Sequence, residues 1–176
     1  LGLDARRDLP RFHRLTFRDW FAGRRAGEAP GAGGRLTVYY AGCFANYYEP
    51  EVGRATVRLL ERNGCKVVLT FEKCCGLPMI ANRNTSGFRR NALHNIDALA
   101  AAVQKGAEIV TACPSCALML KKEYPELIGG DEALLVSEHT QYVDHYLMEW
   151  WAGDRIGERL TAEARSIFYH VPCHLK

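Results

Sequence analysis

The sequence lacks the features that define several large protein classes. None of its apolar stretches approaches the roughly 20 residues that a membrane-spanning helix needs. No secretory signal opens the chain, and no glycine-rich loop resembles a nucleotide-binding motif. These absences argue against a membrane-spanning protein, against a secreted disulfide framework, and against a flavin or substrate-binding part on this chain.

The sequence also has little net charge, +3 over 176 residues, and this charge is unevenly distributed. Residues 1–35 contain eight arginines and four acidic side chains and therefore sum to +4, which leaves −1 for the remainder. The basic character belongs to the leader and not to the body, so the body is not marked as nucleic-acid binding. We therefore expect no nucleic-acid partner.

Residues 1–35 are interpreted as a basic, aromatic leader and linker. Thr16 and Asp19 predict a capped short helix. Its three aromatic side chains share one side: Phe17, Trp20 and Phe21. Residues 23–34, rich in glycine, alanine and proline, predict a flexible connection. Two interpretations of the aromatic side chains stay open. They dock on a partner subunit or an anionic membrane surface, or they pack on the body of the same chain.

Strands alternate with helices in the body, which predicts an α/β layered domain with a mainly parallel sheet flanked by helices. Three β-rich runs carry this prediction: 36–40, 65–71 and 107–112. Helices are expected from Pro50, from about Ser86 to Lys105, from Pro114 to a break at Tyr124-Pro125, and along the apolar stripe of 143–151. Two further strands are expected at 133–136 and 166–171.

Seven cysteines without a secretory signal favour metal binding or catalysis over disulfides. Five of them follow a C…CC…CxxC order: Cys43, Cys74, Cys75, Cys113 and Cys116. They follow three different predicted strands, and ligands gather beyond the C-terminal ends of parallel strands. We therefore expect all five sulfurs at one edge of one sheet. Cys65 begins a strand outside this pattern and is interpreted as a small buried hydrophobe.

Three kinds of chemistry could explain the five thiols. Iron–sulfur ligation fits first, because a four-iron cluster takes at least four protein sulfurs and the CxxC turn brings two to one site. A four-sulfur zinc site is the minority alternative, since zinc ribbons usually pair two CxxC knuckles. Thiol redox chemistry at the CxxC motif is the third, although it leaves the other three cysteines unexplained.

The motifs Gly42-Cys43, Cys74-Cys75-Gly76-Leu77-Pro78 and Cys113-Pro114-Ser115-Cys116 resemble the CCG cysteine-rich domain. This domain occurs, usually twice per chain, in the B subunits of heterodisulfide reductases, in lactate-utilisation iron–sulfur proteins and in the C subunits of anaerobic glycerol-3-phosphate dehydrogenases. The leader, 9–21, and the segment 169–174 make the last group the most similar. The resemblance implies an electron-transfer subunit that is not itself catalytic.

By position, the resemblance implies that the five cysteines bind a [4Fe-4S]-type cluster, cubane or noncubane. Cys173 would be the first ligand of a second unit that is cut short. The implied partners are a flavoprotein dehydrogenase subunit and membrane quinone, with a cytoplasmic location or a peripheral one on the inner membrane face. The expected organisation is a leader (1–35), a first CCG domain (36–165) and the start of a second unit (166–176), so we expect a piece of a longer protein. The rival functions are a heterodisulfide-reductase-like subunit with thiol/disulfide chemistry and a zinc-stapled interaction module.

Overall fold

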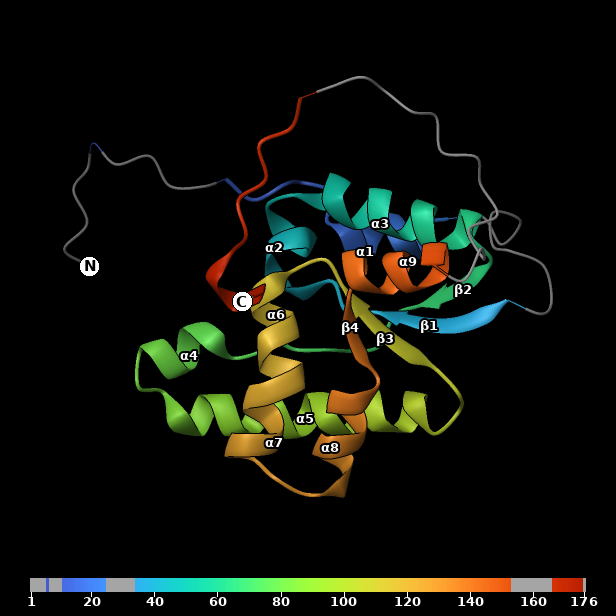
Figure 1. The fold of residues 1–176 in the computed structure, drawn as a ribbon. Helices are drawn as coiled ribbons and strands as arrows, with labels where there is room; N and C mark the ends of the chain where they lie inside the picture. The colour runs from blue at the N-terminus through green and yellow to red at the C-terminus, as the bar shows by residue number, and fades with distance from the viewer. Residues whose placement is uncertain (1–5, 7–10, 25–33, 153–165, 176) are drawn as a thin grey trace.

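The computed structural model describes residues 6, 11–24, 34–152 and 166–175. Its centre is a sheet of four parallel strands in the order β2-β1-β3-β4 (Figure 1). The strands are β1 (Arg35–Tyr39), β2 (Cys65–Val68), β3 (Glu108–Thr111) and β4 (Thr140–Tyr142). The predicted α/β class with a parallel sheet is confirmed. The sequence did not predict β4, because three residues are too few to show the alternation of a strand.

Helices cover both faces of the sheet (Figure 1). One face carries α4 (Leu77–Ala81), α5 (Thr85–Val103), α6 (Pro114–Leu118), α7 (Tyr124–Leu127) and α8 (Asp131–Glu138). The other face carries α1 (Phe17–Ala22), α3 (Pro50–Arg62) and α9 (Val143–Ala152). The short helix α2 (Gly42–Tyr47) follows β1 directly and contacts α1 and α3.

Alternate residues of the central strands fill two separate cores, as the period of two in a strand requires. Val38 and Tyr40 point to the core under α5, whereas Tyr39 and Ala41 point to the core under α3. Both strands in the middle of the sheet are therefore apolar on both faces, which is usual for a parallel sheet covered by helices. This burial fixes the register of the strand ends from which the cysteine segments start.

The strand order places a topological switch between β1 and β3. The chain leaves β1 through α3 to reach β2 on one side, and then returns through α5 to β3 on the other side. In open α/β sheets, ligands bind in the crevice beyond the C-terminal strand ends at such a switch. The topology therefore selects the end of the sheet at which a site is expected.

The leader residues 11–24 lie against the body of the chain. The predicted capping box is present, since Thr16 Oγ1 accepts from the Asp19 N–H at 3.1 Å and Asp19 Oδ2 accepts from the Thr16 N–H at 3.2 Å. Phe17 is fully buried against Tyr39, and Trp20 and Phe21 pack beside it. Of the two interpretations, packing on the chain's own body describes Phe17, Trp20 and Phe21. The expected flexible stretch falls largely on 25–33, which lie outside the described residues.

Three predicted elements were wrong. Residues 133–136 belong to helix α8, where Ala133 and Val136 pack against the rest of the core, so tertiary packing outweighs the β-rich composition. The helix after Pro114 does not break at Tyr124-Pro125. A π-helical turn, Met119–Glu123, leads into α7, and Pro125 lies in the first turn of α7, where a missing backbone N–H is tolerated.

The third wrong element is the strand at 166–171. Among the described residues this segment pairs with no strand, and Ile167 and Phe168 are exposed. A strand needs a neighbour for its backbone groups, and none of the described strands lies beside it.

Among the helices of the described ranges, none combines the length and the apolar composition of a membrane span.

Gly76 ends the loop that carries the paired cysteines, and its backbone φ of +95° lies in the left-handed region. A Cβ atom there would lie 2.5 Å from the Phe88 ring. We expect Gly76→Ala to lower the free energy of unfolding by about 2–4 kcal/mol, the sum of backbone strain and overpacking. Urea unfolding of the purified protein measures this change.

Gly106→Ala is the matched control, because Gly106 also has a positive φ but its Cβ would meet no atom within 4 Å. That variant should lose only about 1–2 kcal/mol, the backbone cost alone. Equal losses in the two variants would show that the contact with Phe88 is not restrictive.

Candidate metal centre

The three strand ends deliver the five motif cysteines to one edge of the sheet. Cys43 lies in the first turn of α2, immediately after β1. Cys74 and Cys75 lie in the loop between β2 and α4, and Cys113 is the N-cap of α6 after β3. Cys116 follows one turn later on the same helix. Parallel strands share one C-terminal edge, so the topology alone brings these segments together.

The five thiols interact in one continuous series. Each thiol shifts the pKa of its neighbour through a side-chain interaction, in the pairs Cys43 and Cys74, Cys74 and Cys75, Cys75 and Cys116, and Cys116 and Cys113. A Cβ atom on Gly42 would lie 2.9 Å from Cys116 Sγ, so the loop after β1 closely approaches the CxxC turn. The structure thus gathers the five cysteines that the sequence selected. Their role as metal ligands stays a prediction.

The Cys43–Cys74 contact favours a thiolate at Cys74. Hydrogen bonds from the thiols of Cys43 and Cys75 lower the pKa of Cys74, and a hydrogen bond from the Gly76 backbone N–H adds to them. The same contact with Cys74, together with burial, raises the pKa of Cys43. One proton is therefore held on Cys43 while the negative charge forms on Cys74.

The CxxC motif likewise combines one thiol whose pKa is lowered with one whose pKa is raised. A hydrogen bond from Cys116 lowers the pKa of Cys113 to about 6, and the backbone N–H groups of Cys116 and Ser115 also favour its thiolate. The pKa of Cys116 is raised, first by its hydrogen bond to Cys113. Thiolates are the species that bind iron and zinc, so this donor set has the charge that a metal group requires.

The other two cysteines lie apart from this series. Cys65 is fully buried at the start of β2, opposite the first residue of β1, and therefore at the other edge of the sheet. Burial raises the pKa of its thiol. Cys173 is exposed in a short 3₁₀ turn, Cys173–Leu175, that contacts α6. Its neighbour His174 hydrogen-bonds Ser115 through Nδ1 at 2.8 Å.

A buried asparagine fixes the backbone of the paired cysteines. Asn95 Oδ1 accepts from the Lys73 N–H at 2.7 Å, and Asn95 Nδ2 donates to the Tyr124 hydroxyl at 2.9 Å. The Tyr124 hydroxyl in turn donates to the Cys75 carbonyl at 3.0 Å, and the Tyr40 hydroxyl donates to the Lys73 carbonyl at 2.7 Å. These bonds connect the loop to α5, to α7 and to Tyr40 directly after β1. The backbone direction of both cysteines is therefore set by the core.

The sequence patterns do not predict this network. Its signal is two asparagines, Asn91 and Asn95, on the buried side of an apolar helix. Such residues inside a hydrophobic stripe need buried partners, and the stripe drew attention only to its apolar members. Asn91 donates to the Cys74 carbonyl at 3.3 Å, so both asparagines serve the same loop.

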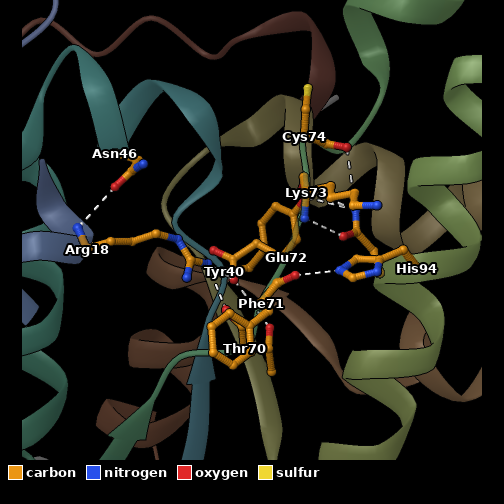
Figure 2. A network of polar contacts seen from close by, with 10 residues as sticks. Arg18, Tyr40, Asn46, Thr70, Phe71, Glu72, Lys73, Cys74 and His94 are labelled. Carbon is orange, nitrogen blue, oxygen red and sulfur yellow. Dashed lines mark hydrogen bonds and ion pairs between the residues drawn. The ribbon is translucent and has the colours of Figure 1, made fainter. Parts of the chain in front are cut away.

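Further contacts from side chains of other elements hold the loop (Figure 2). His94 donates from Nε2 to the Phe71 carbonyl at 2.6 Å. Arg18 of the leader donates to the Thr70 carbonyl at 2.7 Å and forms an ion pair with Glu72. Every residue of the segment 70–75 thus has a partner from another element or from the loop itself.

A pocket of about 400 Å³ opens beside Cys43 and Cys74, and Arg18, Glu72 and Lys73 line it. Within the described ranges, no three cysteine, histidine or acidic side chains converge on one point as a single metal ion would require. A tetrahedral zinc site needs all its ligand atoms within about 2.3 Å of one ion. Of the five thiols, Cys43 and Cys74 line this pocket and Cys75, Cys113 and Cys116 do not. In a multi-iron cluster, separate irons take separate thiolates, so the ligands need not meet at one point.

Comparison with known proteins agrees with the motif. Residues 37–121 match the family model described as the cysteine-rich domain CCG. The chain is 32% identical over 180 residues to the C subunit of the anaerobic glycerol-3-phosphate dehydrogenase of Escherichia coli (strain K12), covering all of this chain and 44% of that protein. It is 34% identical over 139 residues to lactate utilization protein A of Geobacillus kaustophilus (strain HTA426), covering 76% of this chain and 55% of that protein.

A third relative is the D subunit of the dihydromethanophenazine:CoB–CoM heterodisulfide reductase of Methanosarcina barkeri (strain Fusaro / DSM 804). It is 31% identical over 144 residues, covering 78% of this chain and 33% of that protein. The chain therefore spans about half or less of the length of these curated relatives. No solved structure matches it. The resemblance identified from the cysteine motifs is confirmed.

Loss of the buried asparagine should loosen the loop. We expect Asn95→Leu to lower the free energy of unfolding by about 2–3 kcal/mol, because the Lys73 N–H loses its acceptor in the core. Asn91→Leu, on the same helix and with one loop contact, should lose about 1 kcal/mol. Chemical denaturation of both variants tests this order, and a larger loss for Asn91→Leu would contradict it.

Thiol reactivity tests the charge distribution. In the metal-free protein, alkylation of Cys113 by iodoacetamide should rise between pH 5 and 7 and then level off, because its pKa is about 6 and the thiolate is the nucleophile. Cys65 should stay unmodified until the protein unfolds. Mass spectrometry of the peptides reports both rates. Reaction of Cys113 that begins only above pH 8 would show an unshifted thiol.

Proposed function

We propose that this chain, which belongs to the CCG cysteine-rich domain family through residues 37–121, is an iron–sulfur electron-transfer subunit of an oxidoreductase complex. The observation that carries the proposal is the gathering of five thiols from three strand ends at one edge of the sheet, where neighbouring thiols shift each other's pKa. The ligands are Cys43, Cys74, Cys75, Cys113 and Cys116. The group is of the [4Fe-4S] type, cubane or noncubane.

The bound cluster would supply reversible one-electron chemistry, and the protein's part is to hold it. Four of the five thiolates would bind the irons of a cubane cluster, with one to spare, and all five would bind those of a noncubane one. The backbone N–H groups of Gly76, Ser115 and Cys116 would donate to sulfur. Such hydrogen bonds and the burial of the sulfurs set the reduction potential of a cluster. The Asn95 network keeps the Cys74–Cys75 backbone still, so the ligands are positioned before the metal arrives.

One relative supports a proposal for the wider complex. By analogy with the C subunit of the anaerobic glycerol-3-phosphate dehydrogenase, we propose that electrons enter from a flavoprotein dehydrogenase subunit and leave towards membrane quinone. The place of action is the cytoplasm or the inner face of the membrane. Cys173 would be the first ligand of a second CCG unit. The proposed division is a leader (1–35), a first unit (36–165) and the beginning of a second (166–176).

One relative supports a second candidate function. The similarity to a subunit from a heterodisulfide reductase favours a cluster that itself takes part in thiol/disulfide chemistry. The pocket beside Cys43 and Cys74 would then admit a thiol substrate to the cluster. Perturbation of the cluster's electron paramagnetic resonance signal by added thiol would favour this function, and an unchanged signal would favour simple electron transfer. A zinc-stapled interaction module is the remaining alternative.

Metal analysis decides between iron–sulfur and zinc. We expect the protein purified without oxygen to contain iron and acid-labile sulfide and to give a cluster signal in electron paramagnetic resonance. Cys75→Ser should weaken iron retention at least tenfold, since even changes around metal ligands cause losses of about 10–100-fold. Iron and sulfide assays on equal amounts of folded protein measure this.

Cys65→Ala is the control, because Cys65 is equally buried but lies at the opposite edge of the sheet. It should keep its iron even if its stability falls. A colourless wild-type protein that holds one zinc and no sulfide would refute the electron-transfer function. Equal iron losses in the two variants would refute the ligand assignment.

A further inference from the structure

Arg18 of the leader contacts both segments that carry the first three cysteines (Figure 2). Its backbone N–H donates to Asn46 Oδ1 at 3.0 Å, on the helix α2 that also bears Cys43. Its guanidinium donates to the Thr70 carbonyl at 2.7 Å and pairs with Glu72, two residues before Cys74. Arg18 therefore contacts α2 through its backbone and the loop that carries the paired cysteines through its side chain.

The Arg18–Glu72 pair is largely shielded from water. The Glu72 side chain is only 4% exposed and that of Arg18 is 29% exposed. The Thr70 hydroxyl also donates to Glu72 Oε2 at 3.3 Å. A carboxylate buried to this extent needs its counterion, because removing one partner of a buried pair leaves an uncompensated charge. The pair is therefore a fixed feature of the site and not a surface contact.

We propose that Arg18 is a positioning residue of the candidate iron–sulfur centre, and that its ion pair with Glu72 balances charge in the wall of the pocket beside Cys43 and Cys74. The inference rests on the proposed function. It gives residues 11–24 a role that their basic, aromatic composition does not suggest: through α1, the leader holds two ligand-bearing segments together.

The charge argument follows from the placement of the pair. Arg18 and Glu72 both line the pocket that Cys43 and Cys74 line. An added electron makes a thiolate-bound cluster more negative, and the net charge around a cluster is one determinant of its potential. A cation left alone in this wall would favour the reduced state, whereas a carboxylate left alone would disfavour it. The intact pair cancels most of both effects.

The chain offers a matched control. Arg24, also from the leader, pairs with Glu61 of α3 through two hydrogen bonds at 2.8 and 2.9 Å. This pair is similarly shielded, with side chains 13% and 10% exposed, but neither partner lines the pocket beside Cys43 and Cys74. Arg24→Gln removes the same charge from the same leader without touching the cysteine segments.

The positioning role is tested on the metal-free protein. Cys75 is 4% exposed, so its alkylation requires the loop to open. Arg18→Gln should raise the rate of Cys75 alkylation by tenfold or more, as expected for the loss of a charge-assisted contact. Arg18→Lys should restore part of the protection, and Arg24→Gln should leave the rate near that of the wild type. Equal rates in Arg18→Gln and Arg24→Gln would overturn this role.

The charge balance is tested on the iron-loaded protein by redox titration followed with electron paramagnetic resonance. Arg18→Gln should lower the midpoint potential, Glu72→Gln should raise it, and the double variant should lie between them. Shifts of the same sign in both single variants would overturn the charge balance. A wild-type protein without iron and sulfide would refute the proposed function and this balance with it, whereas the metal-free measurement would still decide whether Arg18 holds the loop.

Discussion

The hydrogen bonds of one buried asparagine are the constraint on which the site depends. Asn95 is fully buried on a mainly apolar helix face. Its amide oxygen accepts from the Lys73 N–H, and its amide nitrogen donates to the Tyr124 hydroxyl. Inside a protein such bonds are strong, and an unpaired polar group is costly. The loop with Cys74 and Cys75 therefore cannot move without breaking contacts in the core. Loops are usually among the more mobile parts of a protein. Here the hydrogen bonds to the core hold the loop, and its two sulfurs, in place.

The parallel sheet supplies the second constraint, which is convergence. β1, β2 and β3 end at the same edge, and the chain reverses direction across the sheet between β1 and β3. Each strand end needs only a short extension to bring its cysteine to the crevice. Apolar residues on both faces of β1 and β3 hold this arrangement in register. The position of the thiols is thus a consequence of the hydrophobic core and not of contacts among the thiols.

Charge is arranged in layers around the thiols. The pKa values of Cys74 and Cys113 are lowered, which favours their thiolates. Those of their neighbours Cys43 and Cys116 are raised, so these two keep their protons. Backbone N–H groups donate to these two sulfurs of Cys74 and Cys113, and the Arg18–Glu72 pair lies in the wall of the pocket beside Cys43 and Cys74. Such an arrangement stabilises negative charge on sulfur without a full positive charge in contact with it. The family match and the three relatives agree with the cysteine motif from which the site is built.

The sequence by itself determined the α/β class, the three principal strands and the five cysteines, because periodicity and motif spacing are local properties. Only the tertiary structure decided that 133–136 is helical, that β4 exists and that 166–171 pairs with none of the described strands. It also revealed Asn95, Tyr40, Tyr124 and Arg18 as supports of the loop. Each of these residues contacts the site from a distant part of the chain. Local patterns do not encode such contacts, since they arise only when separate elements are buried against one another.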